Sequence, residues 1–72
     1  MFVEFVGASY ETIDDERNYS PMNRIFVNPD EIAAYYDHTI LTTSGNKIRV
    51  METADEISNR MLNAGAKVKV IV

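Results

Sequence analysis

The side chains that most often carry out chemistry are few in this chain. His38 is the only histidine, and cysteine is absent. A serine triad, or acid–base catalysis built on imidazole, would need His38. That residue stands in the short polar pair Asp37-His38, which is typical of a tight hairpin turn open to water. We therefore expect an exposed turn residue, predict no catalytic residue, and expect that the protein is not an enzyme.

Neither the acidic residues nor the glycines predict a bound ion or cofactor. Asp14, Asp15 and Glu16 are adjacent and could collect a hard cation, but the ordered spacing and the sharp-turn glycine of an EF-hand loop are missing. The three glycines stand far apart, so there is no glycine-rich phosphate loop. Without cysteine, the usual cysteine-based zinc sites are excluded. We predict no metal site and no cofactor.

Length and charge narrow the class of protein. Seventy-two residues allow one domain with a small core, and no disulfide can reinforce it. Self-association is the remaining natural supplement, so we expect a homo-oligomer. The absence of cysteine, of a charged-then-apolar leader and of an apolar run of about 18 residues predicts a cytoplasmic protein with no membrane span. The net charge of −4 disfavours nucleic acid as a partner.

The stretch from Arg24 to Met61 alternates strand patterns with turn signals. Four short segments of strand character are separated by Asn28-Pro29-Asp30, Asp37-His38 and Ser44-Gly45-Asn46. Residues 1–6 predict a further strand before this stretch, and residues 66–72 predict an added C-terminal strand after it. The short connections favour antiparallel pairing, because parallel crossovers need about a dozen residues.

One helix is predicted near the C-terminus. Thr53 and Glu56 have the spacing of a capping box, which marks a helix start, and Gly65 suits the left-handed position after a helix. The apolar stripe between them consists of Ala54, Ile57, Met61 and Ala64, with Leu62 beside it. The fold class is therefore α+β: a single domain, residues 1–72, with a mainly antiparallel β-sheet of five to six strands and one amphipathic helix at about residues 54–64.

Two segments outside residues 24–61 are the candidates for contact with other proteins. Residues 8–21 lack an apolar period and predict an inserted acidic loop, which is either solvated or in contact with a partner. Its predicted partner-binding residues are Tyr10, Glu11, Asp14, Asp15, Glu16 and Tyr19. The apolar last strand needs another strand to pair with, in its own sheet or in a neighbouring subunit. Its predicted oligomer interface consists of Val68, Val70, Ile71 and Val72.

Basic and aromatic residues on strand exteriors define a third candidate surface. Two neighbouring strands could form a basic stripe with aromatic neighbours, able to bind single-stranded nucleic acid or a small ligand. Charged exteriors and edge lysines are also typical of ordinary sheets. The possible ligand or nucleic-acid face consists of Arg24, Phe26, Tyr35, Lys47 and Arg49.

Residues 25–61 resemble the small flagellar and swarming motility proteins of the FlbD/SwrD type. The most specific parts of the resemblance are the sequence VNPDEI at residues 27–32 and KIRVME at residues 47–52. The resemblance implies strands joined by an asparagine-proline-aspartate turn and a glycine turn, followed by a short amphipathic helix. It also implies a non-enzymatic bacterial accessory protein that acts through protein contacts, with no catalytic residues.

Three hypotheses about function follow. We favour a small cytosolic protein-binding or assembly module of bacterial or phage origin, which acts through a homo-oligomer and the acidic loop. The first alternative is a phage or mobile-element inhibitor that blocks a host protein with a compact acidic surface, either as an anti-defence protein or as a nucleic-acid mimic. The second is binding of single-stranded nucleic acid or a small ligand, on the sheet or between subunits.

Overall fold

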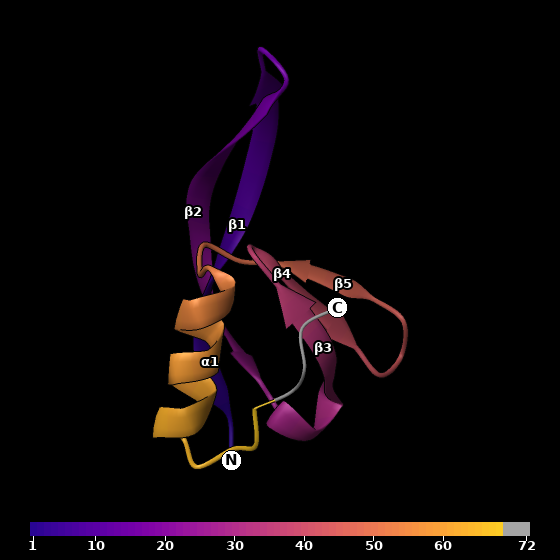
Figure 1. The fold of residues 1–72 in the computed structure, drawn as a ribbon, viewed down its shortest axis with the longest axis vertical. Coiled ribbons are helices and arrows are strands. Elements are labelled where there is room, and N and C mark those ends of the chain that lie inside the picture. The colour runs from indigo at the N-terminus through magenta and orange to yellow at the C-terminus, as the bar shows by residue number, and fades with distance from the viewer. Residues whose placement is uncertain (69–72) are drawn as a thin grey trace.

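Five strands, one short 3₁₀-helix and one α-helix make up the computed structural model, which describes residues 1–68 (Figure 1). The strands form two antiparallel sheets, and the helix follows them near the C-terminus. The predicted α+β fold, with mainly antiparallel strands and one late helix, is confirmed. The elements are β1 (Val3–Ile13), β2 (Glu16–Val27), η1 (Pro29–Glu31), β3 (Ile32–Tyr36), β4 (Thr39–Thr42), β5 (Lys47–Arg49) and α1 (Ala54–Asn63).

β1 and β2 form a long hairpin that rises away from the rest of the molecule (Figure 1). Residues 8–21, predicted to be a loop, are the outer part of this hairpin, so that prediction is wrong. Its strands pair from Ala8↔Pro21 to Ile13↔Glu16 around a two-residue turn. An alternating apolar pattern arises where one face of a strand packs on a core. Neither face of this outer part does so over most of its length, which is why the pattern is missing.

β3, β4 and β5 form a three-stranded meander in that order. The predicted Asp37-His38 turn joins β3 to β4, and His38 takes a positive φ of 60°. The next turn uses Gly45 at φ 89°, and there the Thr42 N–H donates to the Asn46 carbonyl at 2.8 Å. Both turns are where the sequence places them, because each requires a residue that tolerates a positive φ.

The helix α1 begins at the predicted capping box. The Glu56 N–H donates to Thr53 Oγ1 at 3.3 Å, and the Thr53 N–H donates to Glu56 Oε1 at 3.1 Å. At the other end Gly65 adopts φ 76°, as predicted. The predicted apolar stripe of the helix faces the core at Ile57 and Met61, which are both fully buried. Leu62 is 57% exposed, so the stripe is narrower than its sequence pattern.

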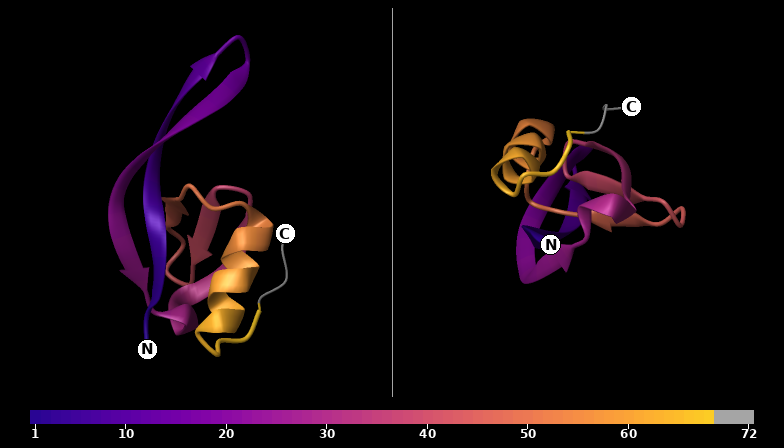
Figure 2. Two further views of the ribbon diagram at one scale, coloured as in Figure 1. Left: turned by 90° about the vertical axis from the view of Figure 1, so that its left-hand side faces the viewer. Right: turned by 90° about the horizontal axis from the view of Figure 1, so that it is seen from below.

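A single core lies between the base of the hairpin, the meander and α1 (Figure 2). The sheets meet where Gly7 bridges to Val50 and where the Met51 N–H donates to the Val6 carbonyl at 2.8 Å. The fully buried residues at the centre include Phe5 and Tyr35. Their burial fixes where the hairpin leaves the body.

The predicted C-terminal strand is only partly within the described residues. Residues 66–68 belong to no strand, and Val68 is 43% exposed. Val70, Ile71 and Val72 lie outside the described residues, so the predicted oligomer interface there stays a prediction. Within residues 1–68, no helix is both long and apolar enough to cross a membrane.

Candidate partner-binding arm

We call residues 9–20 the distal arm. All of them are exposed except the half-buried Tyr19. The molecule measures 38 × 23 × 22 Å along its principal axes, and the arm extends along the long axis (Figure 1). The arm therefore presents both of its faces away from the core over most of its length.

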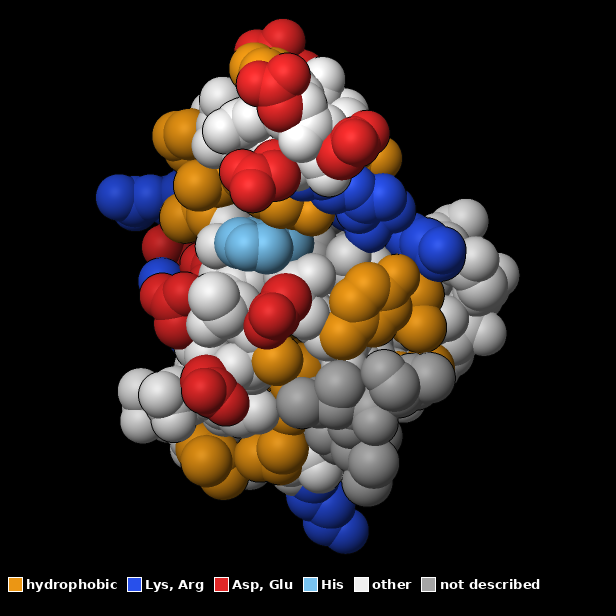
Figure 3. All heavy atoms as spheres, turned by 45° about the horizontal axis from the view of Figure 1, so that its top comes forward, with side chains coloured by type: hydrophobic (Ala, Val, Ile, Leu, Met, Phe, Trp, Pro, Cys, Tyr) orange, Lys and Arg blue, Asp and Glu red, His pale blue; other side chains and the backbone are white. Residues whose placement is uncertain are grey.

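The tip of the arm carries the acidic residues. Asp14 and Asp15 form the turn, with φ values of 51° and 65°, which is the geometry of a type I′ hairpin. Figure 3 shows Asp and Glu side chains at this end of the molecule, with others lower on the body. The four carboxylates predicted to bind a partner are thus brought together, and Ile13, 51% exposed, lies among them. The acidic tip consists of Glu11, Asp14, Asp15 and Glu16.

The two predicted tyrosines lie on the other face of the arm from Glu11 and Glu16. Tyr10 pairs directly with Tyr19, and their ring centroids are 5.5 Å apart. Because side chains alternate across a strand, this face also carries Arg17. The predicted partner-binding residues therefore form two surfaces: the acidic tip and an aromatic pair nearer the body.

Tyr19 anchors the arm to the body. Its ring stacks on His38 with 4.0 Å between centroids and 20° between planes. The His38 Nδ1 is in turn 3.2 Å from the Val50 carbonyl oxygen. His38 is the predicted turn residue, but it is half-buried under Tyr19, so free exposure to water was a wrong expectation. Its environment gives it a packing role, and Figure 3 shows it directly below the arm.

Two guanidinium groups approach the Tyr10 ring. The Arg17 Cζ is 4.5 Å from the ring centroid and the Arg49 Cζ is 5.6 Å from it, which places the two groups within cation–π range of one tyrosine. The Arg49 Nη1 also donates to Thr39 Oγ1 at 2.6 Å. Arg17 is absent from the predicted site residues, because a loop without a pairing strand offers no reason to place it beside Tyr10.

Lys47 completes this group of positive charges. It lies on β5 two residues before Arg49, so both side chains leave the strand on the same side. Desolvation raises the pKa of Tyr36, but hydrogen bonding to Thr39 and the charges of Lys47 and Arg49 outweigh it, so the pKa lies below its ordinary value. We call Arg17, Lys47 and Arg49 the cationic cluster. Figure 3 shows Lys and Arg side chains beside the arm, directly below its acidic end.

The proposed ligand or nucleic-acid face is not assembled as predicted. Tyr35 is fully buried, and its hydroxyl lies 2.6 Å from Ser58 Oγ, so it cannot stack on a base. Arg24 and Phe26 are on β2, in a different sheet from Lys47 and Arg49. Arg24 faces Glu4 at 3.7 Å, and Phe26 is 61% exposed. The prediction that Arg24 and Phe26 lie on a strand beside Lys47 and Arg49 is therefore wrong.

Glu52 is a buried charge that the sequence did not reveal. Its side chain is 3% exposed, and its two oxygens accept the Val6 N–H at 3.1 and 3.2 Å. The Arg60 Nε lies 3.2 Å from Oε2. Glu52 directly precedes the capping box, where an acidic residue is usually exposed, so nothing in the sequence predicts its burial. It ties the base of the hairpin to the helix.

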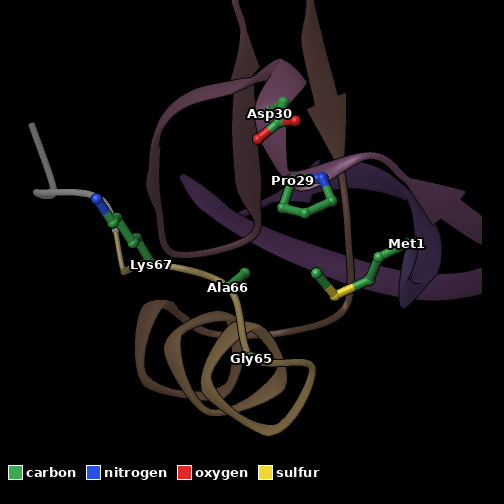
Figure 4. A pocket seen from close by; sticks show the side chains of 6 residues that line it. All are labelled: Met1, Pro29, Asp30, Gly65, Ala66 and Lys67. Atoms are coloured by element: carbon green, nitrogen blue, oxygen red, sulfur yellow. The ribbon is translucent and has the colours of Figure 1, made fainter.

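One hollow lies away from the arm, at the opposite end of the body. It has a volume of about 340 Å³ and lies between η1 and the segment after α1 (Figure 4). Among the residues that the structure describes, Asp30 and Lys67 supply its charged side chains. Two side chains of opposite charge do not form a catalytic or cofactor constellation. Its lining consists of Met1, Pro29, Asp30, Gly65, Ala66 and Lys67.

Residues 1–68 contain no group of three or more histidine, aspartate or glutamate side chains placed to hold a metal ion.

A scan against protein-family models, a search of curated proteins and a search of solved structures each found no match. The resemblance to motility proteins of the FlbD/SwrD type therefore stays a prediction.

Proposed function

We propose that the protein is a small protein-binding or assembly module and that the distal arm is its binding element. The observation that carries this proposal is the projection of the arm beyond the core. The twelve residues 9–20 form paired strands and a turn, yet they contribute almost nothing to the buried interior.

The arm has the physical properties of an element that another surface covers. A two-stranded hairpin is marginally stable alone in water, and its outer strand edges leave backbone groups available for pairing. Peptide segments of partner proteins commonly add to such edges. Ile13 is exposed at the tip and Tyr10 is exposed nearer the body, and aromatic side chains such as Tyr10 are enriched in interfaces. Burial against a partner would stabilise the arm and give these side chains a contact.

The charge of the arm indicates the kind of protein that it would bind. The acidic tip concentrates four carboxylates around a single turn, so a partner with a basic surface would be attracted and oriented by it. The resemblance to bacterial motility accessory proteins is a second reason to expect a role in protein contacts. An inhibitor of a host protein would use the same arm, and the identity of the captured partner separates the two roles.

Affinity capture from the native host tests the proposal. The arm-less variant joins Ser9 and Ser20 through Asn-Gly, because these two residues are paired in register and Asn-Gly favours the required turn. A second variant neutralises the tip as E11Q/D14N/D15N/E16Q. The control, D30N/E31Q/D55N, neutralises three exposed carboxylates elsewhere on the body, one fewer than the tip variant.

The proposal expects a partner that the wild type and the control capture and that the arm-less variant does not. Binding should then be reproduced with the purified partner, with the tip variant at least tenfold weaker because the orienting charges are gone. A partner that binds the folded arm-less variant as tightly as the wild type would overturn the proposal.

A further inference from the structure

The base of the β1–β2 hairpin has one face on the core and one face toward solvent. Val3, Phe5 and Val27 belong to the core. Because side chains alternate along a strand, the residues between them face outward. Two directly paired sets, one residue from each strand, make up this outward side. We call Glu4, Val6, Arg24 and Phe26 the outer base face.

Exposed aromatic side chains distinguish this face. Phe26 is 61% exposed and lies directly opposite Glu4, on the side of the sheet where solvated strands usually carry polar residues. Phe2, directly before β1, is 65% exposed and lines a hollow together with Glu4. Apolar patches of this kind on small soluble proteins commonly mark sites of interaction. The outer base face is therefore a candidate interface.

One acidic and one basic side chain lie beside Phe26. The Arg24 Nε is 3.7 Å from Glu4 Oε2, and the two side chains are 75% and 40% exposed. An ion pair this exposed contributes little within one molecule, because water screens it and ordering two long side chains costs entropy. Both charges are therefore accessible to opposite charges on another surface.

We propose that the outer base faces of two copies pack on each other in a two-fold dimer, with Glu4 of each copy against Arg24 of the other. A two-fold axis that lies between the faces, at right angles to the line from Glu4 to Arg24, exchanges these two residues. Phe26 lies close to that axis, because it is about 5 Å from Glu4 across the strands and about 7 Å from Arg24 along β2. The two Phe26 rings therefore meet at the centre of the dimer.

The charge pattern favours a second copy over an unrelated partner. The face carries one charge of each sign, so a two-fold contact satisfies both, whereas a surface of a single sign would repel one of them. The paired Phe26 rings add an aromatic contact away from water. A chain of 72 residues without cysteine has a small core, and self-association is a common supplement at this size.

This inference goes beyond the proposed function, because the dimer uses the base of the hairpin and leaves the distal arm uncovered. Figure 2 shows the base and the tip at opposite ends of the hairpin. One dimer would therefore present two arms. A partner with two matching sites would be held more tightly by the dimer than by a single arm.

Two single charge reversals, R24E and E4R, test the contact between copies. Each variant alone sets like charges against each other at both contacts of its homodimer, so this dimer should dissociate at least tenfold more readily than the wild type. In an equimolar mixture, the two acidic side chains of R24E lie against the two basic side chains of E4R, so heterodimers should form. The pair within each chain stays like-charged in the mixture, so recovery reports only the contact between copies.

A third variant, Phe26→Ala, tests the apolar centre. Phe26 faces away from the core, so this variant should fold as the wild type does, and its dimer should be at least tenfold weaker. K47E and E31R are matched controls that reverse exposed charges outside the face. Ile13→Ala is the apolar control, since Ile13 is exposed at the far end of the hairpin. All three controls should dimerise like the wild type.

Analytical ultracentrifugation measures dissociation, native mass spectrometry identifies heterodimers by their mass, and circular dichroism checks that each variant is folded. The wild type and the arm-less variant should both be dimers. A monomeric wild type, a folded R24E or Phe26→Ala as dimeric as the wild type, or a mixture of folded variants without heterodimers would each overturn the inference.

The same measurements separate this inference from the proposed function. A monomeric wild type that captures a partner through its arm would refute the dimer and leave the proposed function standing. A wild-type dimer that dissociates in R24E and recovers in the mixture, but captures no partner through its arm, would support the dimer and refute the proposed function.

Discussion

Replacing Glu52 with alanine should destabilise the protein more than the loss of any exposed carboxylate. Glu52 is 3% exposed and accepts the Val6 N–H with both oxygens, while Arg60 approaches from the helix. The alanine variant leaves the Val6 N–H without its acceptor at the base of the hairpin. It also removes the charge that holds Arg60 against the same place.

The cost of Glu52→Ala follows from these contacts. A buried donor left without a partner costs about 1–3 kcal/mol. The ion pair adds at most about 1 kcal/mol, because the Arg60 side chain is 43% exposed and its charge is screened by water. We therefore expect a loss of about 2–3 kcal/mol in the free energy of unfolding. A domain of this length is stable by only about 4–11 kcal/mol, so this loss is large.

Urea denaturation followed by circular dichroism measures the loss. For a domain this small, a slope of about 1 kcal/mol/M converts it into a midpoint lower by about 2–3 M. Glu52→Gln retains an acceptor oxygen and should lose only about 1 kcal/mol. Glu31→Ala removes an exposed carboxylate and should stay within about 0.5 kcal/mol of the wild type. If Glu52→Ala were as stable as Glu31→Ala, or if glutamine were as damaging as alanine, the acceptor role of Glu52 would be refuted.

Three further changes test other contacts. Thr53→Ala should cost about 1 kcal/mol as a lost helix cap. Hydrogen bonds from the backbone and side chain of Thr53 lower the pKa of Glu56 in the folded protein. The ionised carboxylate therefore stabilises the fold above its ordinary pKa of 4.5, and this stabilisation is lost as the pH falls through the pKa of Glu56 in the folded protein. An NMR titration should show a higher Glu56 pKa in Thr53→Ala than in the wild type. Tyr35→Phe removes the hydrogen bond to Ser58 and should cost about 1 kcal/mol in urea denaturation; equal stability would mean that this bond contributes nothing. Tyr19→Ala removes the stack on the body, so amide hydrogen exchange of the distal arm should speed up while that of α1 stays unchanged; an unchanged arm would show that it is held by its strand pairing alone.

Much of the body could be predicted because its turns and caps are local. The capping box at Thr53 and the left-handed glycine at residue 65 each depend on residues within a few positions of each other. The same holds for the Asn28-Pro29-Asp30 turn, where the Asn28 side chain accepts the Asp30 N–H at 3.0 Å. These signals do not depend on what packs against them, so the sequence alone contains them.

Tyr35 was misplaced because a sheet irregularity changed the alternation of its strand. A strict period of two puts Ile32 and Tyr35 on opposite faces. The pairing of β3 with β4 shifts between Ile32 and Ala34, and a shift of this kind changes which side of the sheet the following residues face. Both Ile32 and Tyr35 are consequently buried. Such a shift is set by the partner strand and the core, so one strand read alone cannot show it.

The distal arm was missed for a different reason, which bears on its function. Its strands are related by pairing across the Asp14-Asp15 turn, with Tyr10 opposite Tyr19 and Thr12 opposite Arg17. They have no alternating apolar pattern, because neither face packs on the core over most of its length. Gly7, the residue directly after the strand predicted at residues 1–6, lies at a bulge inside β1, where an added Cβ would approach the Asn23 carbonyl oxygen to 3.1 Å. The chain therefore keeps the two strands paired well beyond the point where they serve its own interior. Ordering these exposed side chains costs conformational entropy that the core does not repay, and this is the physical reason behind the proposed partner-binding role of the arm.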